Sequence, residues 1–252
     1  MNAIACDRCV SPVIEKLEVI GEVKLFNCPL SAEKANRLVE QLKLDSNCYA
    51  LDIGCGEGEF LIRVAEQYGI TGVGVDRNLE LIALAKQKAE KRLPSTTLSF
   101  VCQDAQSFNW EAHKANLIIC IGSEFILGGY RQSLQLFSHY LVNSGSLMIG
   151  TVFWKQEPSP EYLSLMGGEN PHFDYITTVD IALEEGFIPL YLCRSSEDEW
   201  DDFESKHAQK RYLAAMENAD DTAFERIQSW QRGYLRWGID TMGFVFLRLQ
   251  KR

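Results

Sequence analysis

The chain has 252 residues, of which 46% are hydrophobic and 24% charged, and its formal net charge is −10. This length and composition are typical of one sizeable α/β domain with appendages. An acidic surface repels phosphate backbones, so a nucleic-acid partner is disfavoured. No apolar run is long enough to span a bilayer, and acidic residues interrupt the opening segment, which argues against a secretory leader. We therefore expect a cytoplasmic protein that binds neither nucleic acid nor a membrane.

The cysteines do not form the pattern of a disulfide framework. They stand at positions 6, 9, 28, 48, 55, 102, 120 and 193. Cys48, Cys102 and Cys120 lie in or beside expected strands, which predicts small buried side chains. Cys6 and Cys9 form a Cys-x-x-Cys pair, but no second pair completes a zinc site. We expect free thiols and no metal centre.

The first expected elements are an N-terminal arm and one helix, within residues 1–45. Ser31 suits the N-cap of this helix, and apolar residues recur at helical spacing as far as Leu42.

Residues 49–60 then combine an apolar strand, a tight turn and the start of a helix. Its alternate glycines are Gly54, Gly56 and Gly58. A dinucleotide fingerprint needs a third glycine at position 59, where the chain has Glu59. The amide groups at the start of a helix favour an anion, whereas Asp52 in the strand favours a positive amine. Together they indicate a ligand with an amine and a carboxylate, such as an amino acid.

Two further acids follow the next two expected strands, at residues 70–76 and 98–102. Asp76 ends the first of these strands, and an acid in that position can reach ribose hydroxyls. The alternative for Asp76 is a helix-capping acid before Asn78. Asp104 comes just after the other strand, and taken alone it could be a loop acid.

The remaining pattern alternates helices and strands, which predicts a parallel sheet with helices on both faces. The expected strands are 116–121, 146–153, 188–193 and 242–249, and the expected helices run from about 130 to 142, 159 to 166, 177 to 185, 197 to 217 and 221 to 238. The last two helices would form an insertion, residues 195–240, before the final strand.

Residues 52–58 resemble motif I, Asp-x-Gly-x-Gly-x-Gly, of the class I S-adenosylmethionine-dependent methyltransferases, and the resemblance covers residues 49–153. Outside that region the chain resembles a little-characterised bacterial branch of small-molecule methyltransferases. The shared residues are Pro29, Ser31, Glu33, Lys34, Cys120, Gly122, Gly128, Gly129, Trp154, Gln156, Trp200, Asp201, Phe203 and Glu204. At Thr151-Val152 the branch more often has Glu-Pro, so this chain departs from it at the end of the fifth strand.

The resemblance implies a Rossmann-like fold with a seven-stranded, mostly parallel sheet in the order 3-2-1-4-5-7-6. It implies one methyltransferase domain over 1–252, with its core at 46–194 and its last strand at 241–252. The implied activity is in-line methyl transfer from S-adenosyl-L-methionine to a small-molecule acceptor. The implied cofactor-binding residues are Asp52, Gly54, Cys55, Gly56, Gly58, Asp76, Arg77, Gln103, Asp104, Ala105, Ile121 and Gly122. Asp104 would bind the adenine amino group and the Ala105 amide a ring nitrogen.

Fewer features of the sequence indicate which residues would contact the methyl acceptor. Glu124, after the fourth strand, is the best-placed candidate for a catalytic general base, which is needed only if the acceptor must lose a proton. Its alternative is a helix-start or surface acid. Trp154 and Trp200 are candidate walls of an acceptor pocket beneath a lid, or members of a satellite core under the insertion. His172 is the histidine nearest the expected pocket.

Two other function classes remain open on the sequence. One is a Rossmann-like NAD-type oxidoreductase, against which Glu59 argues. The other is a non-catalytic module that binds S-adenosylmethionine without transferring its methyl group.

Overall fold

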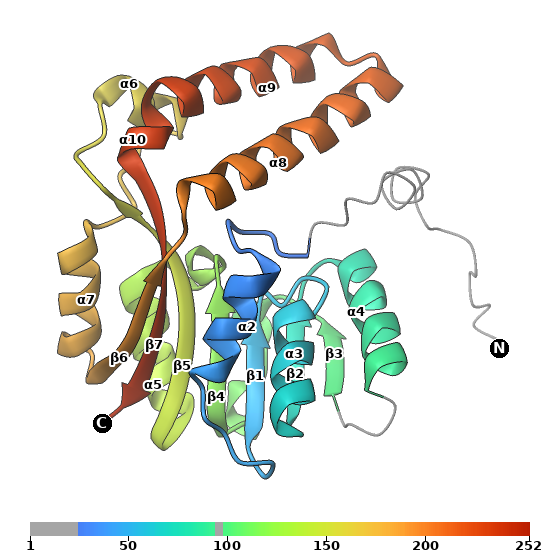
Figure 1. The fold of residues 1–252 in the computed structure, drawn as a ribbon, viewed down its shortest axis with the longest axis vertical. Coiled ribbons are helices and arrows are strands. Elements are labelled where there is room, and N and C mark those ends of the chain that lie inside the picture. The colour runs from blue at the N-terminus through green and yellow to red at the C-terminus, as the bar shows by residue number, and fades with distance from the viewer. Residues whose placement is uncertain (1–24, 94–97) are drawn as a thin grey trace.

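The computed structural model describes residues 25–93 and 98–252, and its described strands form one seven-stranded sheet (Figure 1). The strands are β1 (Tyr49–Ile53), β2 (Thr71–Asp76), β3 (Leu98–Cys102), β4 (Ala115–Ile121), β5 (Leu141–Trp154), β6 (Phe187–Arg194) and β7 (Met242–Lys251). Their order is β3-β2-β1-β4-β5-β7-β6, as expected. The first five are parallel to one another, and β7 is antiparallel to both β5 and β6. The expected arm over residues 1–20, with Cys6 and Cys9, lies outside the described residues.

Helices cover both faces of this sheet. Those on one face are α2 (Ala32–Glu40), α3 (Glu59–Tyr68) and α4 (Leu79–Arg92), and those on the other are α5 (Tyr130–Tyr140) and α7 (Tyr175–Glu184). Alternate residues of the central strands point into two apolar cores. Leu117 and Ile119 of β4 face α2 and α3, whereas Ile118 and Cys120 face α5. This burial on both faces explains why β4 is a continuous apolar run.

An extended helical hairpin stands beyond one end of the sheet (Figure 1). It consists of α8 (Glu197–Asn218) and α9 (Asp221–Gly233), and it joins β7 through a π-helical turn (Tyr234–Gly238) and α10 (Ile239–Thr241). The expected helical stretch over 221–238 is present, with its last five residues in π-helical geometry. Gly233 packs against α6 (Pro160–Leu165) so closely that a Cβ atom there would overlap the Leu165 side chain. The π-helical turn directly follows this close contact between Gly233 and α6.

Three further expectations differ from the structure. Strand β5 begins at Leu141 rather than 146, because the chain passes directly from α5 into the strand with a shift in its register against β4. Helix α7 begins at Tyr175 because the Asp174 side chain accepts a hydrogen bond from the Thr177 amide, at 2.8 Å. Cys102, expected to be buried, is exposed. Within the described part of the chain, no helix is long and apolar enough to cross a membrane.

Candidate active site

The glycine loop after β1 is held in place by the neighbouring strand. The amides of Gly54 and Cys55 both donate to the Val75 carbonyl, at 2.8 and 3.1 Å. Gly54 and Gly56 have positive φ angles of 70° and 55°. A Cβ atom at Gly54 would overlap the Ser123 side chain, whereas one at Gly56 would meet nothing within 4 Å. Gly54 is therefore needed for packing, and Gly56 borders open space.

The third loop glycine and the residue after it have structural roles. A Cβ atom at Gly58 would lie 2.5 Å from the Phe100 ring, so this glycine permits α3 to pack on the sheet. Glu59, which replaces the third glycine of a dinucleotide fingerprint, is buried and forms ion pairs with Arg63 and Arg92, at 2.7 and 2.8 Å. Its carboxylate binds α4 to the start of α3.

Two carboxylates meet at the carboxyl ends of β1 and β2. Burial, and secondarily the charge of Asp76, raises the pKa of Asp52 to about 8. Asp76 accepts hydrogen bonds from the amides of Gly56, at 2.9 Å, and Asn78, at 2.8 Å. Asn78 itself caps α4, with its side chain 2.9 Å from the Glu80 amide. Asp76 therefore braces the glycine loop rather than capping the helix.

Loop residues after β3 complete this edge of the site. The Gln103 amide donates to the Asp76 carbonyl, at 2.9 Å, which keeps the chain beside β2 past the end of β3. Asp104 is exposed and caps a 3₁₀ turn by accepting from the Gln106 amide, at 2.8 Å. Ala105 is buried, and Arg77 is exposed beside this loop.

The end of β4 carries the next predicted residues. Ile121 ends the strand, and Gly122 follows with a φ angle of 67°. Because Ile119 lies opposite Asp52 in the parallel register, these residues meet the glycine loop at one edge of the sheet. A Cβ atom at Gly122 would be 3.8 Å from Cys28, in the segment before α2. No sequence pattern indicates that Cys28 lies at this edge, because Gly122 is more than 90 positions further along the chain.

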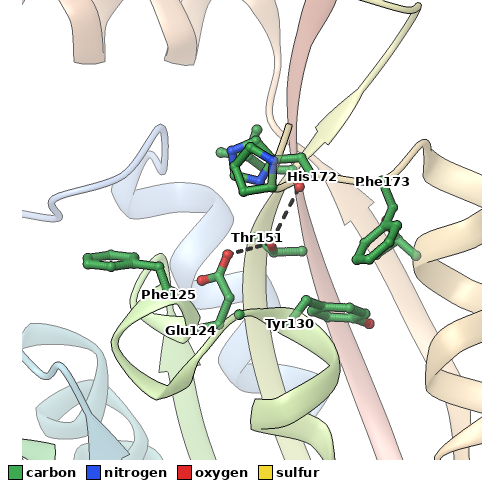
Figure 2. Close-up of a pocket in the computed structure, with 10 residues that line it drawn as sticks. Glu124, Phe125, Tyr130, Thr151, His172 and Phe173 are labelled. Atoms are coloured by element: carbon green, nitrogen blue, oxygen red, sulfur yellow. Dashed lines mark hydrogen bonds between the residues drawn. The ribbon is translucent and has the colours of Figure 1, made fainter. Parts of the chain in front are cut away.

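A pocket of about 40 Å³ lies next to this edge, on the side of β5 (Figure 2). Its walls are Glu124, Phe125, Gly129, Tyr130, Thr151, Val152, Pro171, His172, Phe173 and Thr178. Glu124 is buried, and Thr151 Oγ1 donates to its Oε1 atom, at 2.5 Å. Glu124 Oε2 and the Tyr130 hydroxyl are buried and have no hydrogen-bond partner.

Burial dominates the electrostatics of this pocket. It raises the pKa of Glu124, although the hydrogen bond from Thr151 opposes the shift. Burial also lowers the pKa of His172 to about 4, so the imidazole is neutral at pH 7. Carboxyl and imidazole groups in one enclosed space can exchange protons with a bound molecule.

Trp154 and Trp200 are both buried and do not line this pocket. Trp154 lies behind it, with its ring edge-on to His172 and its Nε1 donating to Asn170 Oδ1, at 2.6 Å. Trp200, in α8, stacks on Tyr234 and meets Phe244 of β7 edge-on. The structure thus brings Glu124 and His172 together and places both tryptophans in the surrounding apolar core.

Comparisons with known proteins bear on the domain family and the fold. Residues 50–145 match the family model of a methyltransferase domain. The chain is 27% identical over 233 residues to the Escherichia coli (strain K12) protein YjhP, a match that covers 87% of this chain and 93% of YjhP. The X-ray structure of YjhP superposes with a TM-score of 0.82 at 24% identity, covering 90% and 95% of the two chains. A Geobacter sulfurreducens methyltransferase bound to S-adenosyl-L-homocysteine superposes with a TM-score of 0.83 at 22% identity, covering 96% and 99%.

Proposed function

We propose that this chain, whose residues 50–145 match the methyltransferase-domain model, is a class I S-adenosylmethionine-dependent methyltransferase that methylates a small-molecule acceptor. Cofactor and acceptor would meet at the carboxyl ends of β1, β2 and β4. This is the edge at which parallel α/β sheets bind ligands.

The observation that carries this proposal is the arrangement of three acids along that edge. Asp52, Asp76 and Asp104 come from the ends of three adjacent strands. Asp52, which is buried, suits the amino group of the cofactor, because a cation nearby would offset the cost of ionising a buried carboxylate. The carboxylate of Asp76 suits the ribose hydroxyls, and the open space beside Gly56 allows the ligand to approach the backbone.

The bound cofactor would supply an electrophilic methyl group, so the chain's residues need mainly to orient the acceptor and exclude water. Glu124 would accept the proton of an acceptor that must lose one. The enclosed pocket with aromatic walls supports a small acceptor rather than a macromolecule. We further propose that residues 1–252 form a single domain in which 195–240 is an insertion.

Calorimetry with S-adenosylmethionine, S-adenosylhomocysteine and NAD tests the cofactor assignment. We expect micromolar binding of the first two and none of NAD, and the reverse would favour an oxidoreductase. A mass-spectrometric screen of a metabolite panel for methylated products, about 14 Da heavier, tests turnover. Binding without any product across the panel would favour a non-catalytic module.

A further inference from the structure

The pocket at the end of β5 contains two buried polar atoms without hydrogen-bond partners, Glu124 Oε2 and the Tyr130 hydroxyl. We propose that it receives an acceptor whose reacting atom is a hydroxyl or amine bearing a hydrogen, and that Thr151 positions Glu124 to take that hydrogen. This inference rests on the proposed methyl transfer and names the acceptor class.

The two oxygens of the Glu124 carboxyl have different surroundings. Thr151 Oγ1 donates to Oε1, at 2.5 Å, and thereby fixes the orientation of the carboxyl group. The other oxygen, Oε2, is buried without a partner. A buried unpaired oxygen costs free energy unless something completes its hydrogen bonding. A donor group on a bound molecule would do so.

The rest of the pocket combines one further polar group with aromatic rings. The Tyr130 hydroxyl is a second buried polar atom without a partner. Phe173 and His172 supply ring faces, and Phe125, which is 69% exposed, stands at the mouth. Figure 2 shows the Glu124 carboxyl reaching toward Thr151 among these aromatic groups. A volume of about 40 Å³ admits a polar head with one or two carbons, and the remainder of the molecule would extend past Phe125.

The titratable groups around Glu124 determine how readily its carboxylate takes up a proton. The titratable groups facing Glu124 are Tyr130 from α5, Cys120 from β4 and His172 from the segment before α7. No lysine or arginine is among the lining residues of this described pocket. A carboxylate without a cationic partner in an apolar site takes up a proton readily. Glu124 therefore suits a general base that becomes neutral during the reaction.

The lone pair of the acceptor oxygen or nitrogen forms a bond to the methyl carbon, and the electron pair of the broken carbon–sulfur bond stays on sulfur. The acceptor's proton passes to Glu124 Oε2 and later to solvent. A positive sulfonium and a negative carboxylate become a neutral thioether and a neutral acid, so the enclosed site is left without an isolated charge.

Infrared difference spectroscopy tests the role of Thr151 without any acceptor. The carbonyl band of protonated Glu124 is the band that Glu124→Gln removes, which separates it from that of Asp52. We expect Thr151→Val, which keeps the side-chain shape but loses the donor, to raise the pKa of Glu124 by about one unit. Thr151→Ser should restore the wild-type titration. An unchanged pKa in a folded Thr151→Val protein would overturn the positioning role.

Matched acceptors test the chemical class. With saturating S-adenosylmethionine, primary and secondary amines and alcohols are compared with tertiary amines and thioethers of the same carbon skeleton. We expect products only from the first group, and Glu124→Gln to reduce turnover about 100-fold while calorimetry shows unchanged cofactor affinity. Methylation of a tertiary amine or thioether would overturn this inference but leave methyl transfer standing. Absence of cofactor binding in the wild-type protein would instead refute the proposed function.

Discussion

Asp76 combines a structural and a proposed binding role in one carboxylate. Asp76→Ala removes the acceptor for the Gly56 and Asn78 amides and the proposed contacts to two ribose hydroxyls. At about 1 kcal/mol for each ribose contact, affinity for S-adenosylhomocysteine should fall tenfold or more in calorimetry. Asp220→Ala is a matched control, because it removes an acid that caps α9 far along the chain. If both variants bind the ligand as tightly as wild type, Asp76 does not hold the ribose.

Gly54 and Gly56 share a backbone conformation but have different surroundings, so alanine should affect them differently. Gly56→Ala should fold with a penalty of about 1 kcal/mol and bind S-adenosylhomocysteine weakly, because the added methyl projects into the open space. Gly54→Ala should lose more stability, since its Cβ atom would overlap Ser123. Gly69→Ala, at a φ angle of 68° beyond α3, controls for the backbone strain alone. Equal affinity in the position-56 and position-69 variants would show that the ligand does not approach Gly56.

The sequence offers more local signals for the proposed cofactor side of the site than for the acceptor side. Asp52 and Asp76 were indicated by local signals, because each lies at the carboxyl end of an expected strand and Asp52 lies just before the glycine turn. The pocket around Glu124 depends on contacts between distant segments, such as Thr151 on β5 and His172 before α7. No spacing rule relates those positions to one another. The pattern therefore indicated Glu124 but could not supply the Thr151 hydrogen bond that orients it.

Among the elements, the strands and helices of the core were predictable from their hydrophobic patterns. Burial on two faces gives the central strands continuous apolar runs, and burial on one face gives the helices apolar residues at helical spacing. An element's boundary or its helix type was not predictable where side-chain capping or close packing determined it. Asp174 begins α7 earlier than the apolar pattern suggests, and Gly233 precedes a π-helical turn where α6 packs against the chain. These are effects of tertiary contacts on local structure, and they cannot be predicted from the periodicity of apolar residues along the sequence.

The first turns of α2 and α8 are joined by one carboxylate. Glu199 accepts a hydrogen bond from the Ser31 amide, at 3.1 Å, and one from the Ser196 amide, at 2.8 Å, and it also binds the buried Lys34 ammonium. Lys34 donates further to the Arg194 carbonyl, at 2.8 Å. The structure thus fixes the helical insertion to the helix that precedes the glycine loop.

Lys34→Met should therefore destabilise the protein by about 3 kcal/mol, because it removes a buried ammonium and leaves the half-buried Glu199 carboxylate without its cation. Burial opposes ionisation, but the hydrogen bonds from Lys34 and Ser31 hold the pKa of Glu199 below its usual value of 4.5. A lowered pKa stabilises the folded state above that value, and the benefit disappears as the pH falls through the folded pKa. Urea unfolding at pH 7 and in acid should show the difference between variant and wild type shrinking on acidification. A constant difference would contradict the ionic contribution, and Arg37→Met, at an exposed pair on the same helix, should change little.

At the scale of the whole molecule, Trp200 packs the helical insertion against the sheet. Its ring lies between Tyr234 at the base of the hairpin and Phe244 of β7, with centroids 6.4 and 6.5 Å away. Trp200→Ala should therefore cost about 3–5 kcal/mol and lower the melting temperature of the protein as one unit. Trp200→Phe, which keeps the ring contacts and removes the buried indole nitrogen that lacks a partner, should cost far less.

The same two variants, with Trp154→Ala beside them, separate a packing role from an acceptor-binding role. Both tryptophans are buried, with 4% and 6% exposure, and neither lines the pocket. We therefore expect Trp200→Ala to keep its cofactor affinity and its turnover per folded molecule once an acceptor is known. Trp154→Ala should reduce turnover more, because its ring supports His172 from behind, at a centroid distance of 5.3 Å. If Trp200→Ala instead binds the cofactor normally and loses turnover without losing stability, the insertion acts as a lid whose Trp200 contacts the acceptor.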